Sequence, residues 1–291
     1  MNTVGIDWGT SSLRVARLDE QGRALEEREF PRGILTVPAG GFPQVFDEAC
    51  GDWMRGDALA LMCGMVGSKQ GWKEAPYAIC PAGLHDIASQ LTWIEPGRIA
   101  IVPGLTCETD GAPDVMRGEE TKAFGVMKLI DAQDATIVMP GTHCKWTRVR
   151  AGRIESFATF MTGEFYAVLR QHSIFARTMP AEDGDIDESA FLQGVDHAMR
   201  TGNLLHAAFS ARTVSLFDRV ASAAAPSYLS GLLIGEELRA ASRDEAVVLV
   251  GADKLTRRYA LALKHLGMTF RTLGQEATWL GLHSIAQEMK L

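Results

Sequence analysis

A carboxylate followed by a hydroxyl-rich turn is the first group of residues in this chain that could do chemistry. The apolar run Val4–Ile6 ends at Asp7, and the turn Gly9-Thr10-Ser11-Ser12 precedes a second predicted strand over residues 13–18. The backbone N–H groups and hydroxyls of such a turn suit phosphate oxygens, and Asp7 beside them suits a hydrated Mg²⁺. A hairpin with a glycine turn and a capping aspartate explains the same residues without any ligand. This stretch alone leaves both interpretations open.

A second copy of the pattern starts the second half of the chain. A predicted strand over residues 136–140 is followed by the turn Gly141-Thr142-His143 and by predicted strands over 144–150 and 154–160. The order of strand, Gly-Thr turn, strand, Gly-Arg turn and strand repeats that of residues 2–30. Two such meanders predict a duplicated architecture. If the halves face each other, both Gly-Thr turns can hold one polyphosphate; a chance repeat of common hairpin chemistry is the alternative.

A glycine-rich loop follows the continuous apolar strand predicted over residues 58–62. The loop 64–72 contains Ser68, Lys69, Gln70 and Trp72, and its glycine spacing does not match a Walker A loop. Loops after buried strands are common binding positions in α/β proteins. We therefore expect a substrate site in which Lys69 pairs with a carboxylate, Gln70 binds hydroxyls and Trp72 forms a wall. A surface loop with turn-forming glycines is the alternative.

Acidic residues gather before and at the start of a predicted helix. Asp114 lies in a predicted loop over residues 105–118, and Glu119 and Glu120 begin the helix that follows. Acids at a helix start usually complement the helix dipole. A carboxylate at that position, directly after a loop, is also well placed to act as general base toward a sugar hydroxyl.

The C-terminal part offers a further candidate contact for a nucleotide. A buried strand over residues 246–250 ends at Gly251-Ala252, and a helix is predicted from Asp253. A strand–glycine–helix unit lets backbone amides approach a nucleotide, although many α/β units share it. The residues between, 162–242, are mostly helical in pattern, and Gly231 with Gly235 predicts close helix packing or a hinge.

Composition bounds the class of protein. The 291 residues are 46% hydrophobic with a mean hydropathy of -0.00, which predicts a globular α/β protein with a substantial core. A net charge of -7 without Lys/Arg runs argues against a nucleic-acid partner. Five scattered cysteines argue against a disulfide scaffold or a zinc cluster. With neither a secretory signal nor a membrane-spanning apolar run, we expect a cytoplasmic protein.

Taken together, the motifs resemble a known group of kinases. The segment Asp7–Ser12 resembles the first phosphate motif of the sugar kinase/Hsp70/actin superfamily, Pro140–His143 its second, and Val248–Ala252 its adenosine motif. Three longer stretches, 64–72, 115–121 and 140–146, together resemble the 2-dehydro-3-deoxygalactonokinase family over essentially the whole chain.

This resemblance implies a fold and a division of the chain. The implied fold is α/β, with duplicated ribonuclease H-like (actin-like ATPase) domains, mixed five-stranded sheets and an interdomain cleft. The implied lobes are residues 1–131, with sugar-acid-binding elements, and 132–291, with nucleotide-binding elements.

The resemblance also implies an activity: ATP-dependent phosphorylation of 2-dehydro-3-deoxy-D-galactonate at its terminal 6-hydroxyl, giving the 6-phosphate and ADP in galactonate catabolism. Asp7 is expected to hold Mg²⁺ through water. The residues expected to hold ATP are Gly9, Thr10, Ser11 and Ser12, with Gly141, Thr142 and His143, for the phosphates, and Gly251 with Ala252 for adenosine. The superfamily commonly uses an Asp as base, whereas the matching helix start here is Gly118-Glu119-Glu120. The base therefore stays open among Glu119, the leading candidate, Asp114 and Glu120.

Two rival functions keep the same fold. One is a kinase of another sugar acid, such as a gluconate derivative, because acceptor stereochemistry depends on pocket details that the motifs do not reveal. The other is a non-catalytic sugar-sensing regulator, which usually carries a DNA-binding helix-turn-helix that is not recognised here. A homodimer is the assembly considered.

Overall fold

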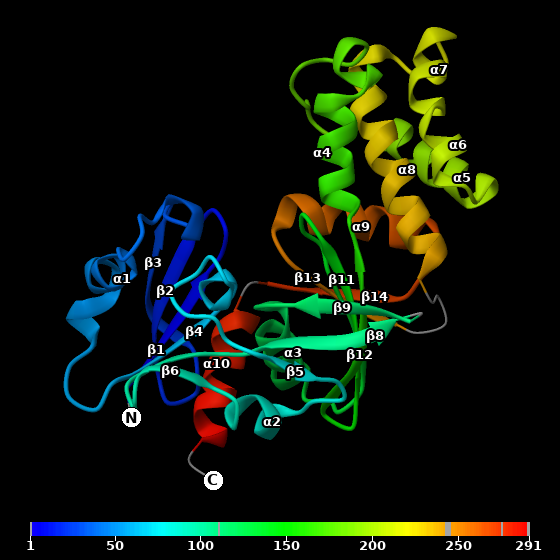
Figure 1. Ribbon diagram of the computed structural model, residues 1–291. Helices are drawn as coiled ribbons and strands as arrows, with labels where there is room; N and C mark the ends of the chain where they lie inside the picture. The colour runs from blue at the N-terminus through cyan, green and yellow to red at the C-terminus, as the bar shows by residue number, and fades with distance from the viewer. Residues whose placement is uncertain (1, 110, 242–245, 275, 290–291) are drawn as a thin grey trace. The chain divides into compact units, whose positions relative to one another are not determined.

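The structure is a computed structural model that describes residues 2–109, 111–241, 246–274 and 276–289. Its internal contacts divide the chain into two compact units. The first unit comprises Met1–Ala135, Thr147–Ala158 and Gly274–Leu291, and the second comprises Thr136–Trp146 and Thr159–Leu273. The C-terminal segment therefore groups with the N-terminal one (Figure 1).

The first unit is built on a mixed sheet. Its strands are β1 (Thr3–Trp8), β2 (Leu13–Leu18), β3 (Ala24–Phe30), β4 (Leu59–Cys63), β6 (Thr92–Glu95) and β7 (Ile99–Ile101). They lie in the order β3-β2-β1-β4-β7-β6, with β1 antiparallel to β2 and parallel to β4. The expectation of five strands is wrong for this sheet. A sixth strand, β6, pairs antiparallel with β7 and forms the edge of the sheet. The predicted N-terminal meander is confirmed.

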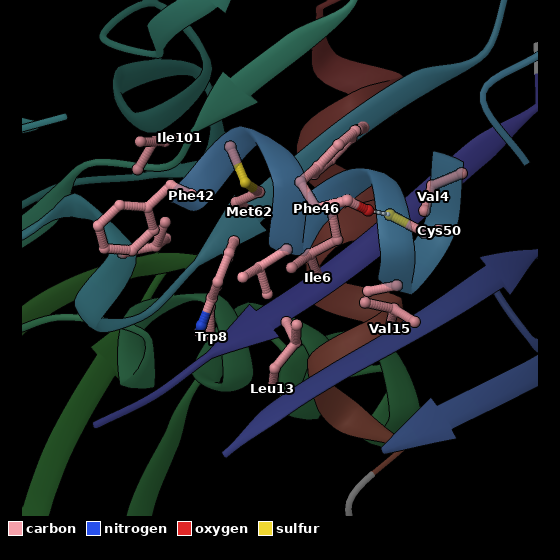
Figure 2. Packing of buried hydrophobic residues seen from close by; sticks show 14 of the residues in the cluster. Val4, Ile6, Trp8, Leu13, Val15, Phe42, Phe46, Cys50, Met62 and Ile101 are labelled. Carbon is pink, nitrogen blue, oxygen red and sulfur yellow. Dashed lines mark hydrogen bonds between the residues drawn. The ribbon is translucent and has the colours of Figure 1, made fainter. Parts of the chain in front are cut away.

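Aromatic side chains fasten the first helix of this unit to the sheet. The helix α1 (Phe42–Cys50) carries Phe42 and Phe46 at helical spacing on its buried face. Val4, Ile6 and Trp8, which alternate along β1, pack against that face (Figure 2). Because Trp8 also donates from Nε1 to the carbonyl of Arg32 at 2.9 Å, the end of β1 is fixed immediately before the Gly-Thr turn.

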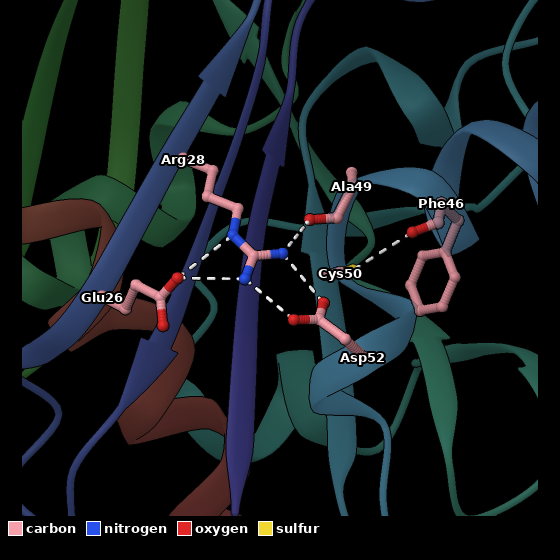
Figure 3. A network of polar contacts seen from close by, with 6 residues as sticks. All are labelled: Glu26, Arg28, Phe46, Ala49, Cys50 and Asp52. Atoms are coloured by element: carbon pink, nitrogen blue, oxygen red, sulfur yellow. Dashed lines mark hydrogen bonds and ion pairs between the residues drawn. The ribbon is translucent and has the colours of Figure 1, made fainter.

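A polar network joins the other end of α1 to β3. Arg28 of β3 donates to both carboxylate oxygens of Asp52, each at 2.8 Å, to the carbonyl of Ala49, and to Glu26 (Figure 3). Its guanidinium also lies 4.0 Å from the ring centroid of Trp53, in the short helix η2 (Gly51–Trp53). These contacts hold the highly charged edge strand β3 against the end of α1.

A small second sheet lies within the first unit. Its strands are β5 (Tyr77–Ile79), β8 (Gly104–Thr109) and β9 (Ala112–Met116), in the order β5-β8-β9. The predicted loop over residues 105–118 is therefore wrong, since β8 and β9 form an antiparallel pair in which Cys107 lies opposite Asp114. Glycine, proline and aspartate suggested a loop, but Gly111, with φ 76°, belongs to the turn, and Pro113 is tolerated because β9 is an edge strand.

Two helices of the first unit cross at glycines. They are α3 (Glu119–Ile130) and the C-terminal α10 (Ala277–Glu288). A Cβ on Gly125 would stand 1.7 Å from the carbonyl oxygen of Ala277, and one on Gly281 would stand 1.9 Å from that of Thr121. The two backbones touch, so neither glycine can be replaced without moving a helix. The short elements of this unit are η1 (Ile34–Thr36), η3 (Met65–Gly67) and α2 (Leu84–Ala88).

The other large sheet, formed by later strands of the chain, has the five strands that were expected. They are β10 (Ala135–Met139), β11 (Cys144–Arg150), β12 (Arg153–Phe160), β13 (Val247–Val250) and β14 (Phe270–Leu273). Their order is β12-β11-β10-β13-β14, with β13 parallel to both β10 and β14. The second predicted meander is confirmed, and it opens this sheet as the first meander opens the other.

Helices make up most of the second unit. They are α4 (Thr162–His172), η4 (Ile174–Arg177), α5 (Glu188–Thr201), α6 (Leu204–Ala208), α7 (Ser210–Leu216), η5 (Ser222–Ala224), α8 (Ala225–Ala240) and α9 (Asp253–His265). A Cβ on Gly231 of α8 would stand 1.9 Å from the carbonyl of Phe191 in α5. Gly231 therefore serves close helix packing, one of the two alternatives predicted for it. No helix in the described residues is both long and apolar enough to cross a membrane.

Candidate active site

The first Gly-Thr turn, residues 9–12, connects β1 to β2 and is braced from behind. Gly9 N–H donates to the carbonyl of Ser12 at 2.9 Å, and Ile34 N–H donates to the carbonyl of Gly9 at 3.0 Å. A Cβ on Gly33 would stand only 2.1 Å from the carbonyl oxygen of Thr10, so the support fits closely. Thr10 and Ser11 are exposed at the surface. A fixed backbone with exposed hydroxyls suits the binding of phosphate.

Three elements of the first unit meet beside this turn. Gly64, at the end of β4, has φ 92°, and a Cβ there would stand 2.9 Å from the carbonyl oxygen of Trp8. Gly118, before α3, has φ 106°, and its Cβ would stand 3.1 Å from Cα of Gly64. The ends of β1 and β4 and the start of α3 are thus adjacent. Asp7 lies at this junction and forms an ion pair with Arg14 at 2.5 Å.

The candidate bases differ in what they can reach. Glu120 is 0% exposed and accepts hydrogen bonds from Gly118 N–H at 2.6 Å and from the Thr121 hydroxyl at 2.9 Å. Burial, together with the charge of Glu119, raises the pKa of Glu120 to about 7. Glu119 is only partly buried and accepts from Arg117 N–H at 3.0 Å. Asp114 lies on β9 and accepts from the N–H of Val115.

The residues expected to bind the substrate do not share one environment. Ser68 is buried, whereas Lys69 and Gln70 are exposed. Trp72 is partly buried and belongs to the aromatic cluster of the first unit, stacked on Phe42 at 6.4 Å between ring centroids. The predicted wall is therefore at least partly a core residue here.

The second Gly-Thr turn, residues 141–143, packs on the start of α4. Glu164 N–H donates to the carbonyl of Thr142 at 2.9 Å, and the Glu164 carboxylate lies 2.5 Å from Nε2 of His143. A Cβ on Gly163 would stand 2.4 Å from the carbonyl oxygen of Gly141. The turn and the N-terminus of an 11-residue helix are in direct backbone contact, which gives a site suited to anions.

A cavity of about 440 Å³ opens beside this turn, within the range of small-molecule sites. Its lining comes from the turn, α4, α8 and α9, and comprises Gly141, Thr142, Thr162, Gly163, Glu164, Tyr166, Ala167, Asp183, Ser230, Leu233, Ile234, Lys254, Leu255, Arg258 and Tyr259. Its aliphatic walls and two cations suit a nucleotide with its phosphates. The two acids of the lining already have partners: Glu164 contacts His143, and Asp183 contacts Arg170 and Tyr166.

Gly251 and Ala252, which were expected to approach adenosine, directly precede α9 but do not line the cavity. A Cβ on Gly251 would stand 3.4 Å from the carbonyl of Pro140, and Ala252 is the N-cap of α9. The residues of α9 that line the cavity are instead Lys254, Leu255, Arg258 and Tyr259. Sequence reasoning missed them, although Lys254 and Arg258 stand one helical turn apart directly after the predicted motif.

A buried carboxylate holds the start of α4 in place. Glu237 of α8 is 2% exposed and accepts from Trp146 Nε1 at 2.7 Å, from the Tyr259 hydroxyl at 2.6 Å, and from the Thr162 hydroxyl. Thr162 and Tyr259 both line the cavity. Glu237 therefore ties two walls of the cavity to β11.

The acidic residues suit a Mg²⁺ ion that is held mainly by water and by the phosphates of a substrate. Among the described residues, no three His, Cys, Asp or Glu side chains gather as a cage for a metal. Mg²⁺ keeps several waters and commonly uses one or two carboxylates together with substrate phosphates. Asp7, at a strand end beside the exposed turn 9–12, fits that arrangement.

Comparison with known proteins decides the family. A model of the family described as 2-keto-3-deoxy-galactonokinase matches residues 7–285. The chain belongs to that family. The match begins at Asp7 and includes both Gly-Thr turns, the glycine-rich loop 64–72 and α9.

Individual relatives agree with the family. The chain is 36% identical to the 2-dehydro-3-deoxygalactonokinase of Escherichia coli strain K12, over 97% of each chain. A crystal structure of a Sinorhizobium meliloti protein, described as a candidate 2-dehydro-3-deoxygalactonokinase, is 36% identical, covers 98% of each chain and superposes with a TM-score of 0.89. The Clostridium difficile activator of 2-hydroxyisocaproyl-CoA dehydratase, with bound ADPNP, covers 100% of this chain and 96% of its own at 14% identity and a TM-score of 0.53. That last likeness concerns the fold alone.

Proposed function

We propose that this member of the 2-keto-3-deoxy-galactonokinase family transfers the γ-phosphoryl group of ATP to the terminal hydroxyl of 2-dehydro-3-deoxy-D-galactonate. The products are the 6-phosphate and ADP, in galactonate catabolism. The observation that carries this proposal is the family match over residues 7–285, together with 36% identity to the E. coli enzyme of that name.

The nucleotide is assigned to the cavity and the two turns. Gly141, Thr142 and His143 would hold phosphates at the N-terminus of α4, with Lys254 and Arg258 adding positive charge at the same cavity. Gly9, Thr10, Ser11 and Ser12 offer a second braced set of amides and hydroxyls. That both turns hold the same triphosphate tail remains a prediction from the repeated sequence pattern. Gly251 and Ala252 keep their proposed place near adenosine.

The transfer step needs one proton acceptor. The sugar hydroxyl oxygen forms a bond to the γ-phosphorus while the bond from that phosphorus to the β–γ bridging oxygen breaks. The hydroxyl proton passes to the Glu119 carboxylate, because this acid is partly exposed whereas Glu120 is not. Positioning and charge stabilisation supply most of the catalysis in phosphoryl transfer.

Asp7 would hold a hydrated Mg²⁺, which when bound offsets the negative charge of the phosphates. Arg14 holds one carboxylate oxygen of Asp7 and thereby orients the group. Substrate contacts would come from Ser68, Lys69 and Gln70 in the loop that follows β4.

The matching start of the two sheets supports a common origin. We infer that each is a ribonuclease H-like domain, the second with five strands and the first with β6 added at its edge. The division at residues 131/132, the cleft between lobes, a homodimer and a cytoplasmic location remain predictions.

A coupled assay of ADP release tests the proposed function. At saturating ATP and Mg²⁺, we expect turnover with 2-dehydro-3-deoxy-D-galactonate to exceed that with its gluconate-series epimer and with D-gluconate. Phosphorus NMR of the product should show a primary phosphate ester at the 6-position. Higher kcat/KM for another sugar acid would assign that acceptor instead, and absence of acceptor-dependent ADP release would reject the kinase proposal.

A further inference from the structure

In the part of the chain that the structure describes, the side chain of Arg117 is buried without a paired anion. It is 9% exposed, and its Nη2 donates to the carbonyl of Ala75 at 2.9 Å. Within the described part of the chain, its Nε and Nη1 have no hydrogen-bond acceptor. Its guanidinium carbon lies 4.2 Å from the centroid of the Tyr77 ring. A carbonyl and a ring stabilise the group in part, but neither offsets its charge as a carboxylate does.

Two other arginines, one buried and one partly buried, have the partner that Arg117 lacks. Arg170 is 8% exposed, and the Asp183 carboxylate lies 2.9 Å from its Nη2. Arg14 has Asp7 at 2.5 Å. The acids that follow Arg117 bond elsewhere: Glu119 accepts from the backbone N–H of Arg117, and Glu120 from that of Gly118. Ordered water could accept the free N–H bonds, but only an anion would also neutralise the guanidinium.

Arg117 packs against the glycine-rich loop 64–72. A Cβ on Gly67 would stand 2.9 Å from Nη1 of Arg117, so the guanidinium fills the space that a side chain at residue 67 would take. Ser68 follows, and its Oγ is also buried without a partner in the part of the chain that the structure describes. Lys69 and Gln70, the next residues, are exposed, so the loop reaches solvent just beyond. The loop thus contributes one unused donor, the Ser68 hydroxyl. Arg117, two residues before α3 begins at Glu119, contributes two more.

We propose that Arg117 binds the carboxylate of the sugar acid, with the Ser68 hydroxyl as a second donor. The inference rests on the proposed function and deepens it, because it names the group that selects an acid over a neutral sugar. Arginine suits a planar carboxylate better than lysine does, since its donors lie in one plane. Lys69, to which the sequence assigned this contact, is exposed and would bind the carboxylate in water, where an ion pair contributes little. Gly67 is required because any side chain there would occupy the place of the guanidinium.

Binding and turnover of the full chain test this proposal separately. Titration calorimetry without ATP measures the Kd of 2-dehydro-3-deoxy-D-galactonate and of its C1 carboxamide, which keeps the size but not the charge. We expect the unmodified protein to bind the acid about a hundredfold more tightly than the amide. In R117Q that preference should vanish through loss of acid binding, while the Kd of the amide changes little. R117K should recover part of the preference.

Two further variants serve as controls. R98Q removes an arginine of the same unit that already has Glu95 at 3.1 Å, and it should keep the preference for the acid. K69Q tests the rival residue: if it, and not R117Q, abolishes the preference, the proposal is overturned. Equal binding of acid and amide by the unmodified protein, or no binding of the acid, overturns it without any variant. If the acid binds through Arg117 yet no ADP is released, the proposed function fails and this inference stands.

Discussion

Two adjacent glutamates at the start of α3 have opposite environments, and the roles proposed for them rest on this difference. Glu119 is partly exposed, whereas Glu120 is fully buried and bound to Gly118 and Thr121. A general base must reach the proton that it removes. We expect E119Q to lower kcat about a hundredfold or more while leaving the KM for ATP nearly unchanged. Steady-state kinetics at fixed Mg²⁺ measure both. D114N is the matched control, and a larger loss of kcat in D114N than in E119Q would transfer the role to Asp114.

Glu120 should instead govern stability as pH changes. Its pKa is raised from 4.5 to about 7 in the folded chain, so between these values the folded state keeps a proton that the unfolded state has lost. The free energy of unfolding should therefore fall as pH rises from about 4.5 to 7, by about 3 kcal/mol, and then level off. In E120Q this fall should be absent, because the amide does not titrate and can still accept from Gly118 while donating to Thr121. Urea unfolding of both proteins at several pH values measures the difference, and parallel curves would contradict it.

Candidate site residues can be selected from the sequence only where a local pattern marks them. Asp7, Gly9 and Thr10 stand out because a strand ends there in a hydroxyl-rich turn. Arg117 and Arg258 do not, since nothing in the sequence indicates that one is buried without an anion and the other lines a cavity. Such properties arise from residues distant in sequence, Ala75 and Tyr77 in the first case and Gly141 and Ser230 in the second.

At the scale of elements, the contact between α4 and the second Gly-Thr turn shapes the proposed nucleotide site. A methyl group on Gly163 would lie 2.4 Å from the carbonyl oxygen of Gly141. This separation is too short for a contact, so backbone atoms would have to move. We expect G163A to raise the KM for ATP about tenfold or more, with a smaller effect on the KM for the sugar acid, because the displaced turn belongs to the proposed phosphate site. Kinetics with each substrate varied in turn check this.

G184A provides the matched control for that prediction. Gly184 lies in the same unit, and a Cβ there would meet no atom within 4 Å. Its KM for ATP should stay within about twofold of that of the unmodified protein, as for most surface changes. Equal effects of G163A and G184A would show that packing against Gly141 does not matter for the nucleotide.

Elements were predictable to the extent that local patterns decide them. Both meanders and the buried strands β4 and β13 lie within one or two residues of their predicted positions, because apolar runs and Gly-containing turns mark them. The pair β8–β9 was missed, since its proline and aspartates favour a loop and its partner β5 stabilises it only after folding. The sixth strand, β6, was missed for the same reason: it is short and depends on β7.

At the scale of the whole molecule, segments that are far apart in the sequence belong to the same compact unit. The last segment, Gly274–Leu291, groups with the N-terminal unit. There, Trp279 and Leu282 of α10 lie 3.1 Å from where a Cβ on Gly5 of β1 would stand, and the Trp279 ring lies 5.5 Å from the guanidinium carbon of Arg14. Since Arg14 is paired with Asp7, the C-terminal helix supports the candidate metal ligand through one intervening residue.

Removing α10 should therefore unfold the first unit. Trp279, Leu282 and Ile285 are nearly or fully buried, and each contributes about 1.5–3 kcal/mol, a sum comparable to the whole stability of a domain. In a chain ending at Leu273, we expect the amides of β1 and β4 to lose protection from hydrogen exchange, whereas those of α5 and α8, which pack on each other in the second unit, stay protected. A chain shortened only after Met289 keeps the whole of α10 and should match the full-length protein. If β1 kept its protection in the chain ending at Leu273, the first unit would fold without α10. The contacts from Trp279 through Arg14 to Asp7 would then contribute nothing measurable to stability.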